Sequence, residues 1–317
     1  YFKASAQYGQ YQRGYQFSFT EPYFLGYRVS AGFDVYQRQY LQSSYRNFAE
    51  KNTGGTIRFG LPITENLTFG VGYTINRQEI DIPATQADLN FLNGEASLAY
   101  VSYVCPTYPT AVCASNSRER LTSIPHYSFV YNTLDNMQMP HDGIYAKFVQ
   151  EFAGAGGDAR FVRSTIDARI YRELYADWGI IGMARIKAGN ITGLGQKVEI
   201  FDNFFLGGET IRGFAPLGIG ARDLTQVGLY KPNSALGGRN YIAGTVEVSM
   251  PFPGTPEEFG LYLSGFSDAG LLWGVDKKAL PAIGTAVPGS LAGFQYVDDV
   301  KLRASVGVGL MWKSPFG

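Results

Sequence analysis

The chain has no excess of charge of either sign, although it is 317 residues long. Its 27 lysines and arginines balance 27 aspartates and glutamates. A nucleic-acid-binding surface needs a concentration of positive charge, so we expect no nucleic acid among the partners of this chain. Apolar residues make up 45% of the sequence, and this content excludes a disordered protein, because disordered chains are poor in apolar residues.

The sequence also lacks a long hydrophobic run. No stretch approaches the roughly 18 uninterrupted apolar residues that a transmembrane helix needs. The first residues do not show the charged and then apolar pattern of a secretion signal. If the chain crosses a membrane, it must therefore cross as strands.

Residues that carry out catalysis or bind metals are scarce, with two histidines and two cysteines in the whole chain. His126 and His141 are too far apart for zinc-ligand spacing. Ser267 lies in a segment that misses the Gly-x-Ser-x-Gly motif by one residue, and its strand pattern points it outward. Phe214 occupies the position where a phosphate-binding loop would carry a lysine. We therefore expect no enzyme, no metal and no cofactor.

Glycine and aromatic residues are abundant, with 39 Gly, 22 Tyr and 22 Phe, and they favour β-structure with many turns. Apolar and polar residues alternate strictly in many segments, and the apolar side is rich in aromatics. This pattern predicts twelve strands, most of them about 9 to 11 residues long, which is the length of a tilted strand that spans a bilayer. The expected strands are 2–8, 15–20, 27–35, 56–63, 67–75, 127–131, 144–148, 162–170, 180–188, 242–250, 261–271 and 302–312.

The connections between these strands differ in length. Links such as 21–26 and 62–66 are short, whereas long ones are expected at 36–53, 76–123, 190–240 and 274–300. Outer-membrane barrels have short periplasmic turns and long outer loops. A soluble sandwich or lipocalin shows the same alternation, but a barrel of about twelve strands has a lumen too wide for side chains to fill. We therefore predict one all-β domain over residues 1–317, a transmembrane antiparallel up-and-down β-barrel with its aromatic face outward.

Both cysteines lie in the longest loop. Cys105 and Cys113 enclose a short segment that contains prolines. On the outer side of a cell envelope, such a pair is expected to form a disulfide. Free thiols are the alternative.

The loop 190–240 is unusually rich in aromatics and glycines between residues 201 and 223. This composition indicates a loop that packs into the lumen of its own barrel. Arg212 would then be shielded from water and would need carboxylate partners. Glu247 and Asp268 lie at inward-facing positions of the two strands that follow, and we predict that they pair with Arg212.

The segment Gly207-Gly208-x-x-Ile211-Arg212-Gly213-Phe214 resembles a loop motif, Val-Arg-Gly-Phe, of the BamA family of outer-membrane insertases, with Ile in place of Val. This family belongs to a superfamily that also includes the TamA and FhaC proteins and homologues from chloroplasts and mitochondria. Further segments resemble the family in order and spacing: 21–23, 237–238, Glu247 with Pro251, 268–270 and 312–317. The resemblance implies that the loop enters the lumen, where Arg212 contacts Glu247 and Asp268.

The resemblance also implies a function, which is to fold and insert β-barrel proteins into the bacterial outer membrane by strand templating at a lateral gate and by local thinning of the bilayer. The implied partners are unfolded outer-membrane proteins as clients, outer-membrane lipid and lipopolysaccharide, and accessory lipoproteins. The family barrel has 16 strands and is preceded by periplasmic POTRA domains, through which the lipoproteins would bind. By this comparison we expect the chain to begin at the third strand of such a barrel and to stop before the last two strands, either as a trimmed barrel core or as a piece of a longer protein that has the seam strands and the POTRA domains.

Two other classes of function remain open from the sequence. One is transport, by a two-partner secretion pore, a TamA-like translocation factor or a passive porin. The other is an outer-membrane lipase or protease, which needs a nucleophile and a nearby base. The two histidines do not provide a convincing base, so the sequence favours transport over catalysis as the alternative.

Overall fold

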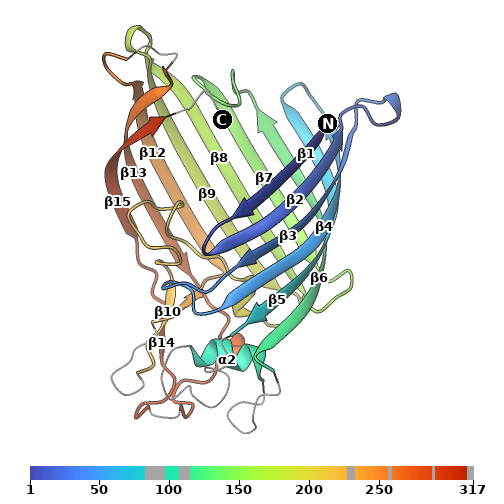
Figure 1. Cartoon of the computed structure of the whole chain (residues 1–317), viewed down its shortest axis with the longest axis vertical. Helices are drawn as coiled ribbons and strands as arrows, with labels where there is room; N and C mark the ends of the chain where they lie inside the picture. Colours follow the sequence, from blue (N-terminus) through green and yellow to red (C-terminus); the bar gives the residue numbers. More distant parts are fainter. Residues whose placement is uncertain (83–96, 107–114, 227–232, 256–258, 288–289, 313–317) are drawn as a thin grey trace.

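The computed structural model describes residues 1–82, 97–106, 115–226, 233–255, 259–287 and 290–312. Most of these residues form one antiparallel sheet of twelve strands, in which each strand pairs with the next along the chain (Figure 1). The strands are β1 (Phe2–Tyr8), β2 (Gln12–Glu21), β3 (Ser30–Tyr40), β4 (Ala49–Pro62), β5 (Leu67–Asp81), β6 (Ser117–Asn132), β7 (Gly143–Ala153), β8 (Phe161–Tyr175), β9 (Ile180–Gly193), β12 (Asn240–Pro251), β13 (Leu261–Trp273) and β15 (Arg303–Trp312). The predicted all-β, up-and-down architecture is confirmed.

Several strands are longer than the sequence pattern predicts. β6 has 16 residues and β5 has 15, whereas their alternating segments cover 127–131 and 67–75. The extra residues of β5 include Asn76, Arg77, Gln78 and Glu79, which are polar on both faces. Alternation disappears where neither face is apolar, so the pattern identifies only part of each strand, and the long connections are correspondingly shorter than expected.

The third strand starts later than predicted, at Ser30 instead of residue 27. Leu25 and Gly26 have positive φ angles of 54° and 82°, and the amide of Phe24 donates a hydrogen bond to the carbonyl of Val29. A chain that turns in this way cannot yet pair as a strand. The apolar residues at 27 and 29 continue the alternation without belonging to the sheet.

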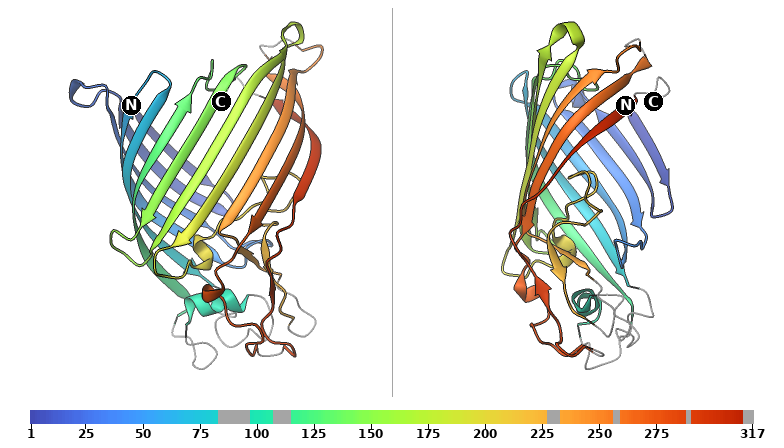
Figure 2. Two further views of the ribbon diagram at one scale, coloured as in Figure 1. Left: turned by 180° about the vertical axis from the view of Figure 1, so that it is seen from behind. Right: turned by 90° about the vertical axis from the view of Figure 1, so that its left-hand side faces the viewer.

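The twelve-stranded sheet is strongly curved, as the two views of Figure 2 show, and we call it the wall. Among the described strands, β1 and β15 are the two ends of the sheet order and do not pair with each other. Large apolar side chains such as Ile57, Phe59, Val71 and Val246 are exposed on the convex face. Their neighbours along the strands point into the concave side.

Smaller elements gather at the end of the wall that carries the long loops (Figure 1). They are α2 (Leu98–Val104), the 3-10 turns η4 (Ile200–Asp202) and η6 (Lys277–Ala279), and a three-stranded sheet of β10 (Ala221–Asp223), β11 (Ala235–Gly237) and β14 (Tyr296–Val297). Two more 3-10 turns, η1 (Phe24–Gly26) and η3 (Ala176–Trp178), lie in short connections. None of the helices in the described ranges is long and apolar enough to span a membrane.

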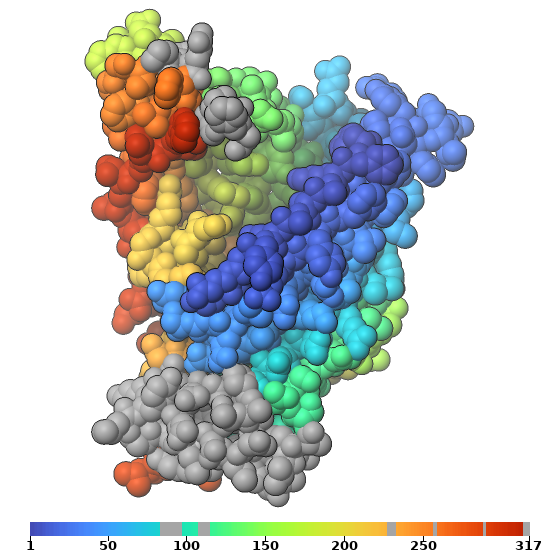
Figure 3. Space-filling view, in the orientation of Figure 1, coloured from blue at the N-terminus to red at the C-terminus, as the bar shows by residue number. Residues whose placement is uncertain are grey.

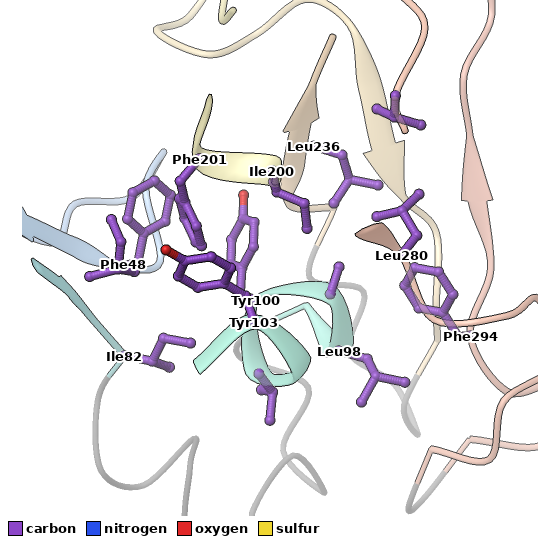
Figure 4. Packing of buried hydrophobic residues seen from close by; sticks show 14 of the residues in the cluster. Phe48, Ile82, Leu98, Tyr100, Tyr103, Ile200, Phe201, Leu236, Leu280 and Phe294 are labelled. Carbon is purple, nitrogen blue, oxygen red and sulfur yellow. The ribbon is translucent and has the colours of Figure 1, made fainter. Parts of the chain in front are cut away.

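The largest buried apolar cluster lies among these loops, with Ile80 at the end of β5 as its contribution from the sheet. Phe201 of η4 packs against Phe48, with ring centroids 4.8 Å apart, and against Tyr103 of α2 at 4.7 Å. Leu236 of β11 and Phe294 are fully buried in the same cluster (Figure 4). The long loops therefore share one apolar core. We call these loops, together with α2 and the small sheet of β10, β11 and β14, the cap.

Candidate functional site

The connection from β9 to β12 lies against the concave face of the wall. Phe204 packs edge-to-face on Tyr241, an inward residue of β12, with ring centroids 4.6 Å apart. The same ring covers Gly189 of β9, where an added Cβ would come within 2.7 Å of the Phe204 ring. In the space-filling view part of this loop, in yellow, lies between the early strands, in blue, and the late strands, in orange and red (Figure 3).

Arg212 lies at the tip of this loop and contacts two carboxylates of the wall. Its Nη1 donates to Glu247 Oε2 of β12 at 2.7 Å. Its Nε and Nη2 donate to Asp268 Oδ2 and Oδ1 of β13 at 2.7 and 2.8 Å, and its main-chain amide donates to Asp268 Oδ2 at 3.0 Å. The structure thus brings together the three residues that the sequence selected, in the bidentate geometry in which arginine binds carboxylates most strongly.

Burial makes this contact difficult to break. The Asp268 side chain is 1% exposed and that of Glu247 is 16% exposed, while Arg212 is 33% exposed. Without the arginine, Asp268 would be a buried charge with no cation beside it, and such a charge is costly. The loop tip is therefore fastened to β12 and β13 by charge and by geometry.

Phe266 and Gly307 complete the arginine site, and sequence reasoning missed both. The Arg212 guanidinium lies over the Phe266 ring, 3.5 Å from its centroid. Phe266 pairs across strands with Gly307 of β15, where an added Cβ would be 2.5 Å from the ring. The sequence did contain a signal for this site. Most inward positions of the wall are polar, and Phe266 is an aromatic residue at an inward position opposite a glycine.

The remaining motif residues shape the loop. Gly207, Gly208 and Gly213 have φ angles of 121°, 59° and 86°, which favour glycine over other residues. The amide of Gly208 donates to the carbonyl of Phe214 at 2.9 Å and closes the turn. Ile211 is fully buried against the wall. These residues present Arg212 to the wall and add no reactive group of their own.

A second buried ion pair, also missed from the sequence, holds the beginning of the loop. Arg120 of β6 donates from Nη1 to Asp202 Oδ2 of η4 at 2.8 Å, and the two side chains are 5% and 7% exposed. Arg120 lies beyond the alternating segment of its strand, so its direction could not be inferred. The charge of Asp202 within an aromatic loop was the available signal.

The other candidate residues do not assemble into a site. His126 faces Gly72 inside the wall, whereas His141 lies in the turn between β6 and β7, where its Nδ1 is 3.1 Å from Asp135. Ser267 pairs with Val246 on the outward face. No group of three or more His, Cys, Asp and Glu residues comes together in the described parts of the chain.

Cys105 is the C-cap residue of α2 and is disulfide-bonded. Cys113, the other cysteine of the sequence, lies outside the described residues. The closing segment 313–317, one of the motifs matched from the sequence, is outside them as well.

Comparison with known proteins places these features in one family. The model of the Omp85 superfamily domain matches residues 1–317. The outer membrane protein assembly factor BamA of Neorickettsia risticii is 30% identical over 291 residues, which are 91% of this chain and 33% of that protein. The protein of the same name from Nitratidesulfovibrio vulgaris is 27% identical over 307 residues, 95% of this chain and 32% of the relative. The chain thus spans about a third of the length of these relatives.

A solved structure shows the same fold. The crystal structure of BamA from Haemophilus ducreyi lacking POTRA domains 1–3 superposes with a TM-score of 0.74 at 20% identity. The match covers 98% of this chain and 58% of that one.

Proposed function

This chain belongs to the Omp85 superfamily of the outer membrane, and from that membership we propose that it is the membrane-spanning part of a factor that folds and inserts β-barrel proteins. The relatives named as assembly factors support this role. The observation that carries the proposal is the loop arginine bound to Glu247 and Asp268 on the inner wall. This is the contact that the resemblance of the loop motif to the insertase family implies.

In the proposed mechanism the loop keeps one part of the wall rigid while another part receives the client. Arg212 joins β12 to β13 through one carboxylate on each strand, so the register between these strands is held from inside. A client strand would pair with an unpaired strand edge, which offers a row of free N–H and C=O groups. A short apolar wall would also thin the bilayer beside it. The proposal includes no chemical step, no metal and no cofactor.

The proposed partners follow from the same role. Unfolded outer-membrane proteins are the clients, and outer-membrane lipid and lipopolysaccharide surround the convex apolar face. Accessory lipoproteins would bind through POTRA domains of the longer protein. Each is a proposal for this chain.

Replacing the loop arginine tests the function. In Arg212→Ala the carboxylates of Glu247 and Asp268 lose their cation, which should weaken docking of the loop on the wall by about 3 to 5 kcal/mol. We expect slower client insertion into lipid vesicles, measured as the appearance of heat-modifiable client on gels. Arg172→Ala is the matched control, because Arg172 forms an exposed ion pair with Asp142 in a short-turn region. Unchanged insertion and unchanged protease resistance of the loop in Arg212→Ala would contradict the proposal.

Transport is the second candidate class, as a two-partner secretion pore, a TamA-like translocation factor or a passive porin. A passive pore predicts steady ion conductance in planar bilayers that persists when the loop is fixed in place. The loop against the inner wall and the cap at one end of it favour low conductance. Client insertion without steady conductance would separate the insertase from this alternative.

A further inference from the structure

We infer that two separate ion pairs, the anchors, hold the connection from β9 to β12, residues 194–239, which we call the lumen loop. Arg120 is the positioning residue of the second ion pair. The first anchor joins Arg212 to β12 and β13. The second joins Asp202, ten positions earlier in the same loop, to a different part of the wall. The inference deepens the proposed function and rests on it, because it concerns how the insertase loop is held.

The second anchor involves three strands of the wall. Both terminal nitrogens of Arg120 on β6 donate to the Asp202 carboxylate, at 2.8 Å for Nη1. Gln78 of β5 accepts from Arg120 Nη2 at 3.4 Å. Arg163 of β8 donates from Nη2 to the main-chain carbonyl of Asp202 at 3.0 Å. Side chain and backbone of one loop residue are therefore both fixed to the wall.

Burial distinguishes this pair from an ordinary surface contact. Arg120 and Asp202 are 5% and 7% exposed, so each charge depends on the other for its stability. Arg77 of β5 and Glu119 of β6 also form an ion pair, but their side chains are 61% and 48% exposed. Exposed pairs of this kind contribute little, which makes Arg77 a matched control.

The position of Asp202 gives the anchor its effect. On one side, Phe201 packs into the cap against Phe48 and Tyr103. On the other, Phe204 lies on Tyr241 of β12. An ion pair that fixes Asp202 therefore sets the position of the first arm of the loop, residues 194–206, between the cap and the wall. The two anchors share no side chain, so each arm can be released while the other stays bound.

Trypsin can report on the two arms separately. Lys197 lies in the first arm with its side chain 45% exposed, and Arg212 lies at the tip. In the full-length protein folded into lipid vesicles, we expect Arg120→Gln to raise the rate of cleavage after Lys197 by about ten-fold, because cleavage follows the population of opened loop. Cleavage after Arg212 should keep its original rate, and the wall should stay heat-modifiable. Arg77→Gln should change neither rate.

A second variant keeps the test valid if Arg120→Gln fails to fold. Asp202→Asn alters the loop and leaves the wall sequence intact, and it should raise cleavage after Lys197 to the same extent. The double variant should cleave no faster than either single variant, since both remove the same pair. Unchanged cleavage after Lys197 in folded Asp202→Asn, or an equal rise after Arg212, would overturn the inference.

Client insertion by the same variants separates a positioning role from a structural one. We expect Asp202→Asn to slow client insertion while heat-modifiability of the wall is unchanged. A variant that is cleaved rapidly after Lys197 and still inserts clients at the full rate would overturn the positioning role. If the unaltered protein inserts no clients, the proposed function fails, whereas the cleavage pattern still decides whether the second anchor exists.

Discussion

Glycine at position 307 lets an aromatic ring lie flat beneath the loop arginine. Gly307 and Phe266 face each other on neighbouring strands, and the space where a Cβ would stand at 307 is taken by the ring. The ring in turn lies under the Arg212 guanidinium. A small residue on β15 thus decides the position of a cation that belongs to a loop far away in the sequence.

A side chain at this glycine should loosen the arginine. Gly307→Val forces the Phe266 ring away from its position, and overpacking of this kind costs about 1 to 3 kcal/mol. We expect a lower urea midpoint in lipid vesicles and faster trypsin cleavage after Arg212. Gly265→Val is the control, because a Cβ at Gly265 meets no atom within 4 Å. Equal midpoints for the two variants would show that the ring does not depend on Gly307.

The residues of the arginine site were partly accessible from the sequence. Strict alternation along a strand fixes which side chains point inward, so Glu247 and Asp268 could be selected as partners of Arg212. Alternation does not reveal which inward residues meet a loop, and Phe266 was therefore missed. Arg120 was missed for another reason, since it lies outside 127–131, the alternating segment of its strand.

At the scale of elements, the strands were predictable and the cap was not. All twelve wall strands contain a segment with period two, because the bilayer requires an apolar outer face. The cap consists of α2 with 7 residues and of strands of two or three residues. Isolated elements this short are unstable in water, so their formation depends on the shared apolar cluster, which local sequence does not encode.

The small sheet of the cap contains a buried carboxyl whose titration should be measurable. Asp223 of β10 is fully buried, and its Oδ1 accepts a hydrogen bond from the amide of Thr225 at 2.8 Å. Burial raises the pKa of Asp223 above its usual value. A raised pKa means that the folded cap binds the proton more tightly than the unfolded chain does. Protonated Asp223 therefore stabilises the folded cap. This stabilisation is complete below the unfolded-state pKa of about 3.9 and is lost as the pH rises through the folded-state pKa.

The cap should therefore be more stable in mild acid than at neutral pH. We expect the amides of β10 and α2, corrected for intrinsic exchange, to show greater protection from hydrogen exchange as the pH falls toward 4. Asp223→Asn should remove this pH dependence, because the amide oxygen can still accept a hydrogen bond but cannot ionise. Asp177→Asn in the exposed turn η3 serves as the control. A pH dependence that survives in Asp223→Asn would assign it to another group.

At the scale of the whole molecule, the wall is inverted relative to a soluble protein. Its large apolar side chains are exposed on the convex face, while ion pairs such as Arg212 with Glu247 and Arg120 with Asp202 lie on the concave face. The buried apolar clusters consist of loop residues and of the wall residues packed against them, such as Ile80, Ile191 and Leu272. This distribution is stable only where hydrocarbon, and not water, surrounds the convex face.

An arginine on the convex face tests this inversion, because its cost depends on depth in the bilayer. Val246 is exposed in the middle of β12, whereas Leu174 is exposed near the short-turn end of β8. Val246→Arg should lower stability by about 2 to 4 kcal/mol and Leu174→Arg by about 0 to 1 kcal/mol, as expected for the midplane and the interface of a bilayer. Urea titration of the protein in vesicles, followed by heat-modifiability, measures both. On a water-exposed sheet the two changes would each cost less than about 0.5 kcal/mol, so nearly equal midpoints would contradict a convex face buried in lipid.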